Sequence, residues 1–478
     1  MGWAGGEFSS APTCAKVTES LLRASSKRQT RPTGIAFFFH SGKVHCLDLT
    51  RGDFGSTYGR MLKSGVPWPT LPILPNLQKI SFWGAGGAEF HEFIRVFPGP
   101  CLTDVSFSWH DKSCTDDLLR SLLKHSPSLR RLSISLIFGE FYHDIIKDPA
   151  ETTVGGLSHL QEFLFDSSLP GHIIKQLATL PHLHVLEFRV SNSMSVWQPA
   201  PGTVYFPSLR VLKVGVESIS PVLVGIIEPL TRLECLTVRI QAQPTAEPLR
   251  SLLQSITGNV RLSNLEVRLT IKPANFSPAH LANPDTLEPL ACLPLRVLDM
   301  STVPFSLRDS SFVTLNEHFP DIRKLCLGHS VERTTSIVTL AGLEKIAEHF
   351  PKLEVLGIQC KWKRFRRADL GCARVEHLAL QRFEPGVHMP QDPPLVAGIL
   401  SALFPNATVS QEAVCSDPST TVPEVWQDVK MMKEVMDLVR RQERLRLQPI
   451  ATSVRVRSVC LCLPMHSMAL TKCLADSR

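Results

Sequence analysis

The amino-acid sequence predicts an α/β fold: a curved solenoid with parallel strands on the concave face and helices on the convex face. A short apolar pattern recurs along most of the 478 residues. The segments between its copies have helical spacing, and prolines stand where each helix must end. Together these observations predict an irregular solenoid of about 13 repeats over residues 35–410.

The strands are predicted by a pattern of three apolar residues, the first followed by two variable residues and the second by one. The second and third apolar residues lie two apart and share one face of a strand. Neighbouring copies lie about 28 residues apart. Clear copies begin at Leu77, Leu129, Leu183, Leu209, Leu233, Leu295, Ile322 and Leu353, and weaker ones at Val44, Leu102, Leu160, Leu262 and Val375.

Helices are predicted between the strands, where the apolar spacing changes to that of a helix face. A proline commonly stands just before the next strand pattern, as Pro207 and Pro351 do. Proline cannot continue a helix and biases the preceding residue to extended geometry, so it ends the helix and directs the strand. The predicted helices cover residues 116–123, 171–180, 220–227, 246–256, 310–319 and 340–350.

A single strand–helix unit is too small to fold alone. Its three large apolar side chains contribute about 1.5–3 kcal/mol apiece when buried. Ordering the backbone costs on the order of 1–2 kcal/mol for each residue. Stacked units share their apolar faces, so the sequence predicts one cooperative array.

The pattern resembles the leucine-rich repeat, L-x-x-L-x-L-x-x-N/C, without its final Asn or Cys. Copies that open with FP-x-L-x-x-L, such as the one at Phe206, resemble the repeat half of fungal F-box-like proteins. The resemblance implies a non-enzymatic, substrate-recognition subunit of an SCF-type (Skp1–cullin–F-box) ubiquitin ligase. In that family an N-terminal F-box binds Skp1 and the repeats hold the protein substrate.

The N-terminal segment departs from this family. Residues 1–73 contain no Leu-Pro-x-Glu opening followed by a long helix-forming stretch, and residues 1–34 are predicted to be disordered. The alternative function is therefore a free-standing interaction scaffold that lacks a functional F-box. In either case we expect a chain that is a monomer within its complex.

The C-terminal region is predicted to contain a linker at 411–421, an amphipathic helix at 422–447 and a disordered tail at 448–478. Two interpretations of the helix stay open: a cap on the last repeat or a partner-binding helix. Its apolar residues follow spacings of four and three, as on one helix face. They are Val425, Val429, Met432, Met436 and Val439.

The candidate binding residues lie beside the buried strand positions and should point to the concave face. Basic residues recur there in successive repeats, which favours a partly acidic protein partner. The candidates are Trp83, Arg131, Glu187, Arg189, Lys213, Arg239, Glu266 and Arg268.

Other functions find little support in the sequence. No G-x-S-x-G, H-E-x-x-H or P-loop pattern is present, so we predict no enzyme, cofactor or metal. More than half of the net charge of +7 lies beyond Glu424, which argues against a nucleic-acid-binding body. The cluster 361–367 fits a solvated loop, a partner contact or a nucleic-acid contact. Thirteen scattered cysteines and no secretory signal predict reduced thiols and a cytoplasmic or nuclear location.

Overall fold

The computed structural model describes most of the predicted repeat region. The described residues are 43–49, 74–83, 97–109, 120–136, 154–190, 204–270, 280–329, 336, 338–362, 375–386, 388–410 and 425–446. They divide into two units. Unit 1 comprises Met1–Ser306 with Glu317–Thr334, and unit 2 comprises Leu307–Asn316 with Thr335–Arg478.

The described residues of unit 1 form eleven strands, each hydrogen-bonded in parallel to the next in the order of the sequence. Leu186, Leu212 and Leu236 are register partners on three successive strands, so the repeats stack as predicted. The strands are β1 (Cys46–Leu49), β2 (Lys79–Trp83), β3 (Asp104–Trp109), β4 (Arg131–Leu136), β5 (Glu162–Ser168), β6 (Val185–Val190), β7 (Val211–Val216), β8 (Cys235–Ile240), β9 (Asn264–Leu269), β10 (Val297–Met300) and β11 (Lys324–Leu327).

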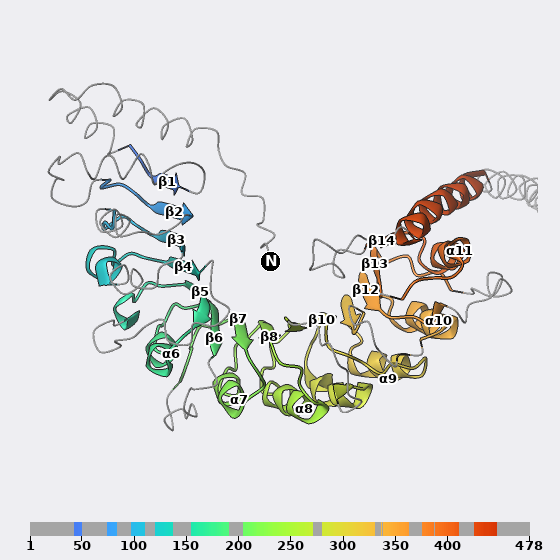
Figure 1. Ribbon diagram of the computed structural model, residues 1–478, viewed down its shortest axis with the longest axis horizontal. Helices are drawn as coiled ribbons and strands as arrows, with labels where there is room; N and C mark the ends of the chain where they lie inside the picture. The colour runs from blue at the N-terminus through green and yellow to red at the C-terminus, as the bar shows by residue number, and fades with distance from the viewer. Residues whose placement is uncertain are drawn as a thin grey trace, which may run out of the picture. The chain divides into compact units, whose positions relative to one another are not determined.

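The helices of unit 1 lie on one side of this sheet, outside the arc of strands (Figure 1). Their apolar residues, such as Ile174, Leu223 and Leu253, are fully buried on the side that faces the sheet. This is the layer arrangement predicted for a leucine-rich-repeat solenoid. The elements are η1 (Val154–Gly156), α6 (Gly171–Ala178), α7 (Pro221–Ile227), α8 (Ala246–Ser255) and η3 (Pro284–Cys292), while residues 120–125 are also helical.

One backbone arrangement fixes the register of successive repeats. The carbonyl oxygen of His184 accepts hydrogen bonds from the N–H groups of Arg210 and Val211, both at 2.9 Å. The same double acceptance recurs at the carbonyls of His45, Thr103 and Arg210. Each repeat is therefore attached to the previous one, at the entrance of its strand, chiefly through main-chain atoms. Some side chains add to the joint, as the hydroxyl of Thr103 does by donating to the carbonyl of Gln78 at 3.1 Å.

Unit 2 continues the same plan with strands β12 (Val355–Ile358), β13 (Arg382–Pro385) and β14 (Thr408–Val409). Helices α10 (Leu340–His349) and α11 (Pro393–Leu403) belong to it, and a further helix covers residues 425–446. The bounds of α9 (Ser311–His318) cross the division between the two units.

The last predicted repeat, beginning at Val375, was placed too early in the sequence. Leu378 is 57% exposed, whereas Leu380 and Phe383 are fully buried and β13 begins at Arg382. The physical reason is His377, whose buried ring occupies the strand entrance. Its Nδ1 accepts from the N–H of Leu380 at 3.0 Å, so its Nε2 donates to the carbonyl of Phe350 at 2.6 Å. The short strand β14 was not predicted.

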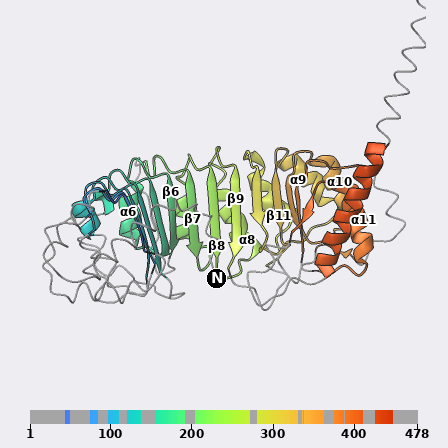
Figure 2. The same ribbon diagram turned by 90° about the horizontal axis from the view of Figure 1, so that it is seen from above.

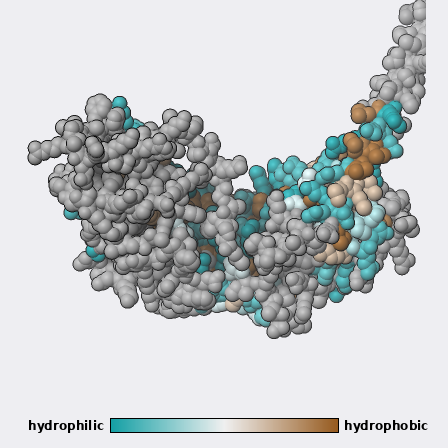
Figure 3. All heavy atoms as spheres, turned by 45° about the horizontal axis from the view of Figure 1, so that its top comes forward, coloured by the Kyte–Doolittle hydropathy of each residue, from teal (hydrophilic) through white to brown (hydrophobic). Residues whose placement is uncertain are grey.

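The helix at 425–446 belongs to unit 2 (Figure 2) and packs through a face that only partly matches the predicted one. Trp426 and Val429 are buried, but Met432 and Val439 are 36% and 48% exposed. Trp426 lies in edge contact with Trp362, with ring centroids 5.5 Å apart. Figure 3 shows hydrophobic residues gathered on the outer surface of this helix.

Charged residues complete the packing of this helix. Lys433 Nζ lies 2.5 Å from Asp437 Oδ2, and the hydroxyl of Ser401 in α11 donates to Asp437 Oδ1 at 2.5 Å. The side chain of Lys433 is only 3% exposed. This buried pair turns the helix away from the apolar face that its sequence suggested.

Several predicted segments lie outside the described residues: the N-terminal 1–34, the linker 411–421 and the tail 448–478. Within the part of the chain that the structure describes, no helix is both long and apolar enough to cross a membrane.

Candidate functional site

The strands of unit 1 leave one face uncovered by the helices, and we call it the open face. On β7, Leu212, Val214 and Val216 are buried, whereas Lys213 alternates with them and is part-exposed. The register aligns such positions into rows across the sheet. The middle row holds Ser81, Ser106, Ser133, Leu164, Glu187, Lys213, Thr237, Glu266, Asp299 and Cys326.

The N-terminal part of the open face is rich in serine and carries its charges in a neighbouring row. There Lys79 and Asp104 form an ion pair of 3.5 Å, and Arg131 Nε lies 3.2 Å from Glu162 Oε2. The candidate residue Arg131 is therefore paired within the sheet. Charges alternate in sign along this row, so it presents no net charge to a partner.

Three candidate residues meet around Glu187. Its carboxylate is 7% exposed and lies beneath two cations from the next two strands. Arg239 Nη1 lies 3.0 Å from Oε1, and Lys213 Nζ lies 3.7 Å from Oε2. A buried carboxylate is tolerated in a sheet because such partners replace its water.

Asp299 is the centre of a second cluster, together with Lys324, Arg268 and Glu266. Lys324 Nζ lies 2.6 Å from Asp299 Oδ2, and Arg268 Nη2 lies 3.6 Å from the same oxygen. Arg268 also contacts Glu266, which accepts a hydrogen bond from Thr237 at 3.4 Å. The candidate residues Glu266 and Arg268 are thus brought together.

The protonation of Asp299 reflects this environment. Burial alone would raise its pKa, but the charges of Lys324 and Arg268 and the N–H of Ser301 outweigh burial. The pKa of Asp299 is therefore lowered, and the carboxylate stays ionised. Asp299 and Lys324 were absent from the candidate set, although the position of Asp299 between Leu298 and Met300 matches that of Glu187 between Leu186 and Phe188.

The remaining candidates are Arg189 and Trp83. The side chain of Arg189 lies across β7 above Gly215, where an added Cβ would approach Arg189 Cγ to 2.9 Å. Within the described residues Arg189 has no ion pair, unlike Lys213, Arg239 and Arg268. Trp83 ends β2 opposite Ser108, and its side chain lies outside the described part.

The open face therefore carries a set of ion pairs. The sequence predicted charged residues of both signs on this face but not their pairing. Glu187 and Asp299 are nearly buried, whereas the side chains of Lys213, Arg239 and Arg268 are 37%, 38% and 49% exposed. The carboxylates thus lie beneath, and the cations form the accessible surface.

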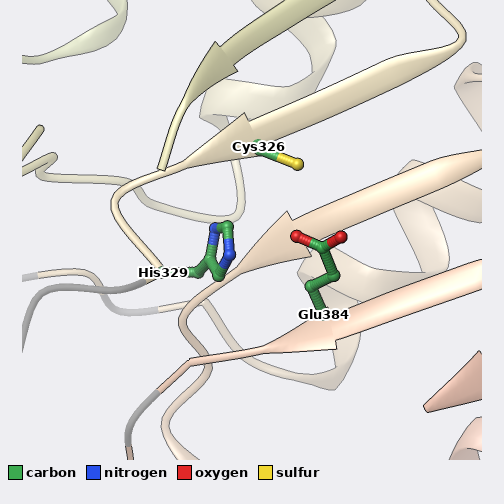
Figure 4. A group of neighbouring side chains, drawn as sticks. All are labelled: Cys326, His329 and Glu384. Carbon is green, nitrogen blue, oxygen red and sulfur yellow. The ribbon is translucent and has the colours of Figure 1, made fainter. Parts of the chain in front are cut away.

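Cys326, His329 and Glu384 carry side chains of the types that bind metal ions (Figure 4). Cys326 lies on β11 and His329 just after it, both in unit 1, whereas Glu384 lies on β13 in unit 2. Glu384 is ion-paired with Arg382 on its own strand at 3.0 Å. We assign no metal site to these residues.

The basic cluster at 361–367 is described only as far as Trp362. That side chain is 4% exposed and packs against Trp426 and Phe383, with ring centroids 5.5 and 6.3 Å away. Trp362 is therefore part of the core of unit 2 and is not available to stack on a nucleic-acid base.

Comparisons with known proteins identify no family for this chain. No protein-family model matches the chain. No curated protein matches it either. Among solved structures, the chain is similar to the crystal structure of the Rad7 and Elc1 complex in yeast, with 13% identity and a TM-score of 0.32. The match covers 73% of this chain and 78% of that chain. A likeness this weak adds nothing to the fold assignment, which rests on strand order and register.

Proposed function

We propose that this chain is a non-enzymatic leucine-rich-repeat protein that holds another protein against the open face of unit 1. The observation that supports this most is the ordered charge network around Glu187 and Asp299. Eleven strands at a spacing of about 4.8 Å give this face a width of roughly 48 Å. Such a broad surface suits an extended polypeptide better than a small ligand.

The chemistry of the face favours a partly acidic partner. An arginine side chain has five N–H donors, and Arg239 spends few of them on Glu187. The buried carboxylate holds the guanidinium in place, and 38% of the Arg239 side chain is exposed toward a partner's carboxylates and carbonyls. Pre-organised groups of this kind lose less entropy on binding.

A charge-reversal experiment tests the open face. We expect Arg189→Glu with Arg268→Glu to abolish binding of a partner that the unmodified chain captures from cells. The matched control is Arg250→Glu on α8, which also removes an ion pair, to Glu288 at 3.0 Å, but lies on a helix of the opposite side. Arg189→Glu alone disturbs no ion pair among the described residues, so it separates binding from folding. Equal capture of the partner by all the variants would exclude the open face as its binding site.

At the finer level we propose a substrate-recognition subunit of an SCF-type ubiquitin ligase, acting in the cytoplasm or nucleus. This part rests on the resemblance of the repeats to fungal F-box-like proteins. The test is co-expression of the full chain with Skp1, followed by size-exclusion chromatography and cross-linking. A stable complex with cross-links in residues 1–75 would support it. Absence of a complex would favour the free-standing scaffold.

A further inference from the structure

The helix at 425–446 exposes an apolar face that nothing in the described chain covers. Its charged residues Lys433 and Asp437 point to the rest of unit 2, so its apolar residues are left outside. Single exposed apolar residues are ordinary, but a contiguous group of this kind marks an interaction surface. The exposed members are Met431 (58%), Met432 (36%), Val435 (61%), Leu438 (57%), Val439 (48%) and Leu445 (64%).

The spacing of this face is that of a coiled-coil seam. Met431, Val435, Leu438, Gln442 and Leu445 follow one another at steps of four, three, four and three. This heptad spacing keeps one stripe of a helix facing a second helix. Gln442 is the polar member of these five positions.

We propose that the helix of a second copy of this chain packs antiparallel on this seam. Charge complementarity supports this occupant and this direction. With Val435 against the partner's Leu438, Glu434 lies beside the partner's Arg441, and symmetry repeats the pair. The same register places Met432 beside the partner's Val439. The parallel alternative would place Arg441 beside the partner's Arg446, where like charges repel.

The contact is small compared with a permanent dimer. A standard interface buries roughly 800 Å² on each partner, more than one short helix face provides. We therefore expect a reversible dimer with a dissociation constant on the order of micromolar. This inference differs from the sequence-based expectation of a monomer and is independent of the proposed binding at the open face.

Sedimentation equilibrium of the full chain tests the dimer. We expect a monomer–dimer equilibrium that Val435→Glu with Leu438→Glu weakens by roughly a hundredfold or more, since charges would enter the seam. Both side chains are more than half exposed, so circular dichroism and thermal unfolding should be unchanged. The matched control is Leu378→Glu, which is also 57% exposed but lies outside the helix. A full chain that stays monomeric at 100 µM would overturn the proposal, whether its own tail covers the face or nothing does. An equal loss of dimer affinity with Leu378→Glu would overturn it as well.

Charge swaps test the direction of pairing. In the antiparallel arrangement Arg441→Glu faces the partner's Glu434 and should weaken the dimer roughly tenfold. Adding Glu434→Arg should restore it, because both pairs become attractive again. In a parallel pair Arg441→Glu would instead face the partner's Arg446. A dimer strengthened by Arg441→Glu would therefore overturn the antiparallel assignment.

Discussion

Gly342 in α10 shows how closely single residues of unit 2 are fitted. A Cβ at this position would lie 2.5 Å from Asp309 Oδ1 and 2.9 Å from Val338 Cγ1. Asp309 has little room to move, since it accepts hydrogen bonds from the N–H (2.8 Å) and hydroxyl (2.6 Å) of Thr339. These bonds satisfy the start of the helix.

We expect Gly342→Ala to destabilise the protein by about 1–3 kcal/mol, although alanine favours helices more than glycine does. Urea denaturation measures the change. Gly155→Ala is the control, because no atom lies within 4 Å of the Cβ that it would add. Equal stability of the two variants would show that Asp309 yields without cost.

Asp299 gives a pH-dependent prediction. Its pKa is lowered below the ordinary 3.8, so the ionised form contributes stability above that pH and loses it as the pH falls through the folded-state pKa. We expect Asp299→Asn to cost roughly 1–3 kcal/mol at pH 7. The difference from the unmodified protein should shrink by pH 3 in urea denaturation. If the difference in unfolding free energy does not depend on pH, the loss comes from packing and not from the charge of Asp299.

At the residue level, period-two alternation predicts which side chains reach the open face. It does not predict the ion pairs, because Arg239 reaches Glu187 from two strands away. That contact depends on side-chain reach and sheet twist, which a linear pattern does not contain. The ion pair between Asp299 and Lys324 was not predicted either, although the pattern places both residues beside buried strand positions.

Among the elements, the helix at 425–446 combines a confident helix pattern with an unexpected packing face. The sequence spacing predicted that the valine and methionine side chains form the packing face. In the structure, Trp426 and the Lys433–Asp437 pair form the contact with the rest of unit 2. A hydrophobic pattern cannot predict a buried ion pair, because it assigns buried positions to apolar residues. The same limit applies to His377, which displaced the predicted last repeat.

The ion pair itself can be tested. Asp437→Ala would leave the ammonium of Lys433 buried without its partner, and burial already lowers the pKa of Lys433. We expect a loss of about 3–5 kcal/mol in the attachment of this helix. Faster amide hydrogen exchange across residues 425–446 would report this loss. Lys433→Met combined with Asp437→Leu should restore slow exchange. If Asp437→Ala leaves the exchange rate unchanged and the double variant does too, the ion pair has no structural role.

For the whole molecule, the sequence predicted the solenoid well because its period is repeated many times. Each copy is weak evidence, but the twelve copies from Val44 to Leu353 match β1 to β12 in order, and only the copy at Val375 was misplaced. The division into two units and the short strand β14 follow from no such repetition. They depend on local departures from the pattern, which the pattern cannot indicate.

A stacked array also predicts where substitutions cost most. Leu236 on β8 is 1% exposed between two neighbouring strands, whereas β1, which carries Leu47, pairs with β2 alone among the described strands. We expect Leu236→Ala to cost about 2–5 kcal/mol and Leu47→Ala clearly less. Chemical denaturation compares them. Equal costs would argue against nearest-neighbour stacking.

The double acceptance by the carbonyl of His184, repeated along unit 1, has a consequence for how such a protein can change. Because the joints are made by peptide groups, part-exposed side chains such as Thr237 are not needed to hold the stack together. Recognition and architecture are thereby decoupled: a lineage can acquire new binding preferences one substitution at a time while the scaffold that displays them stays the same.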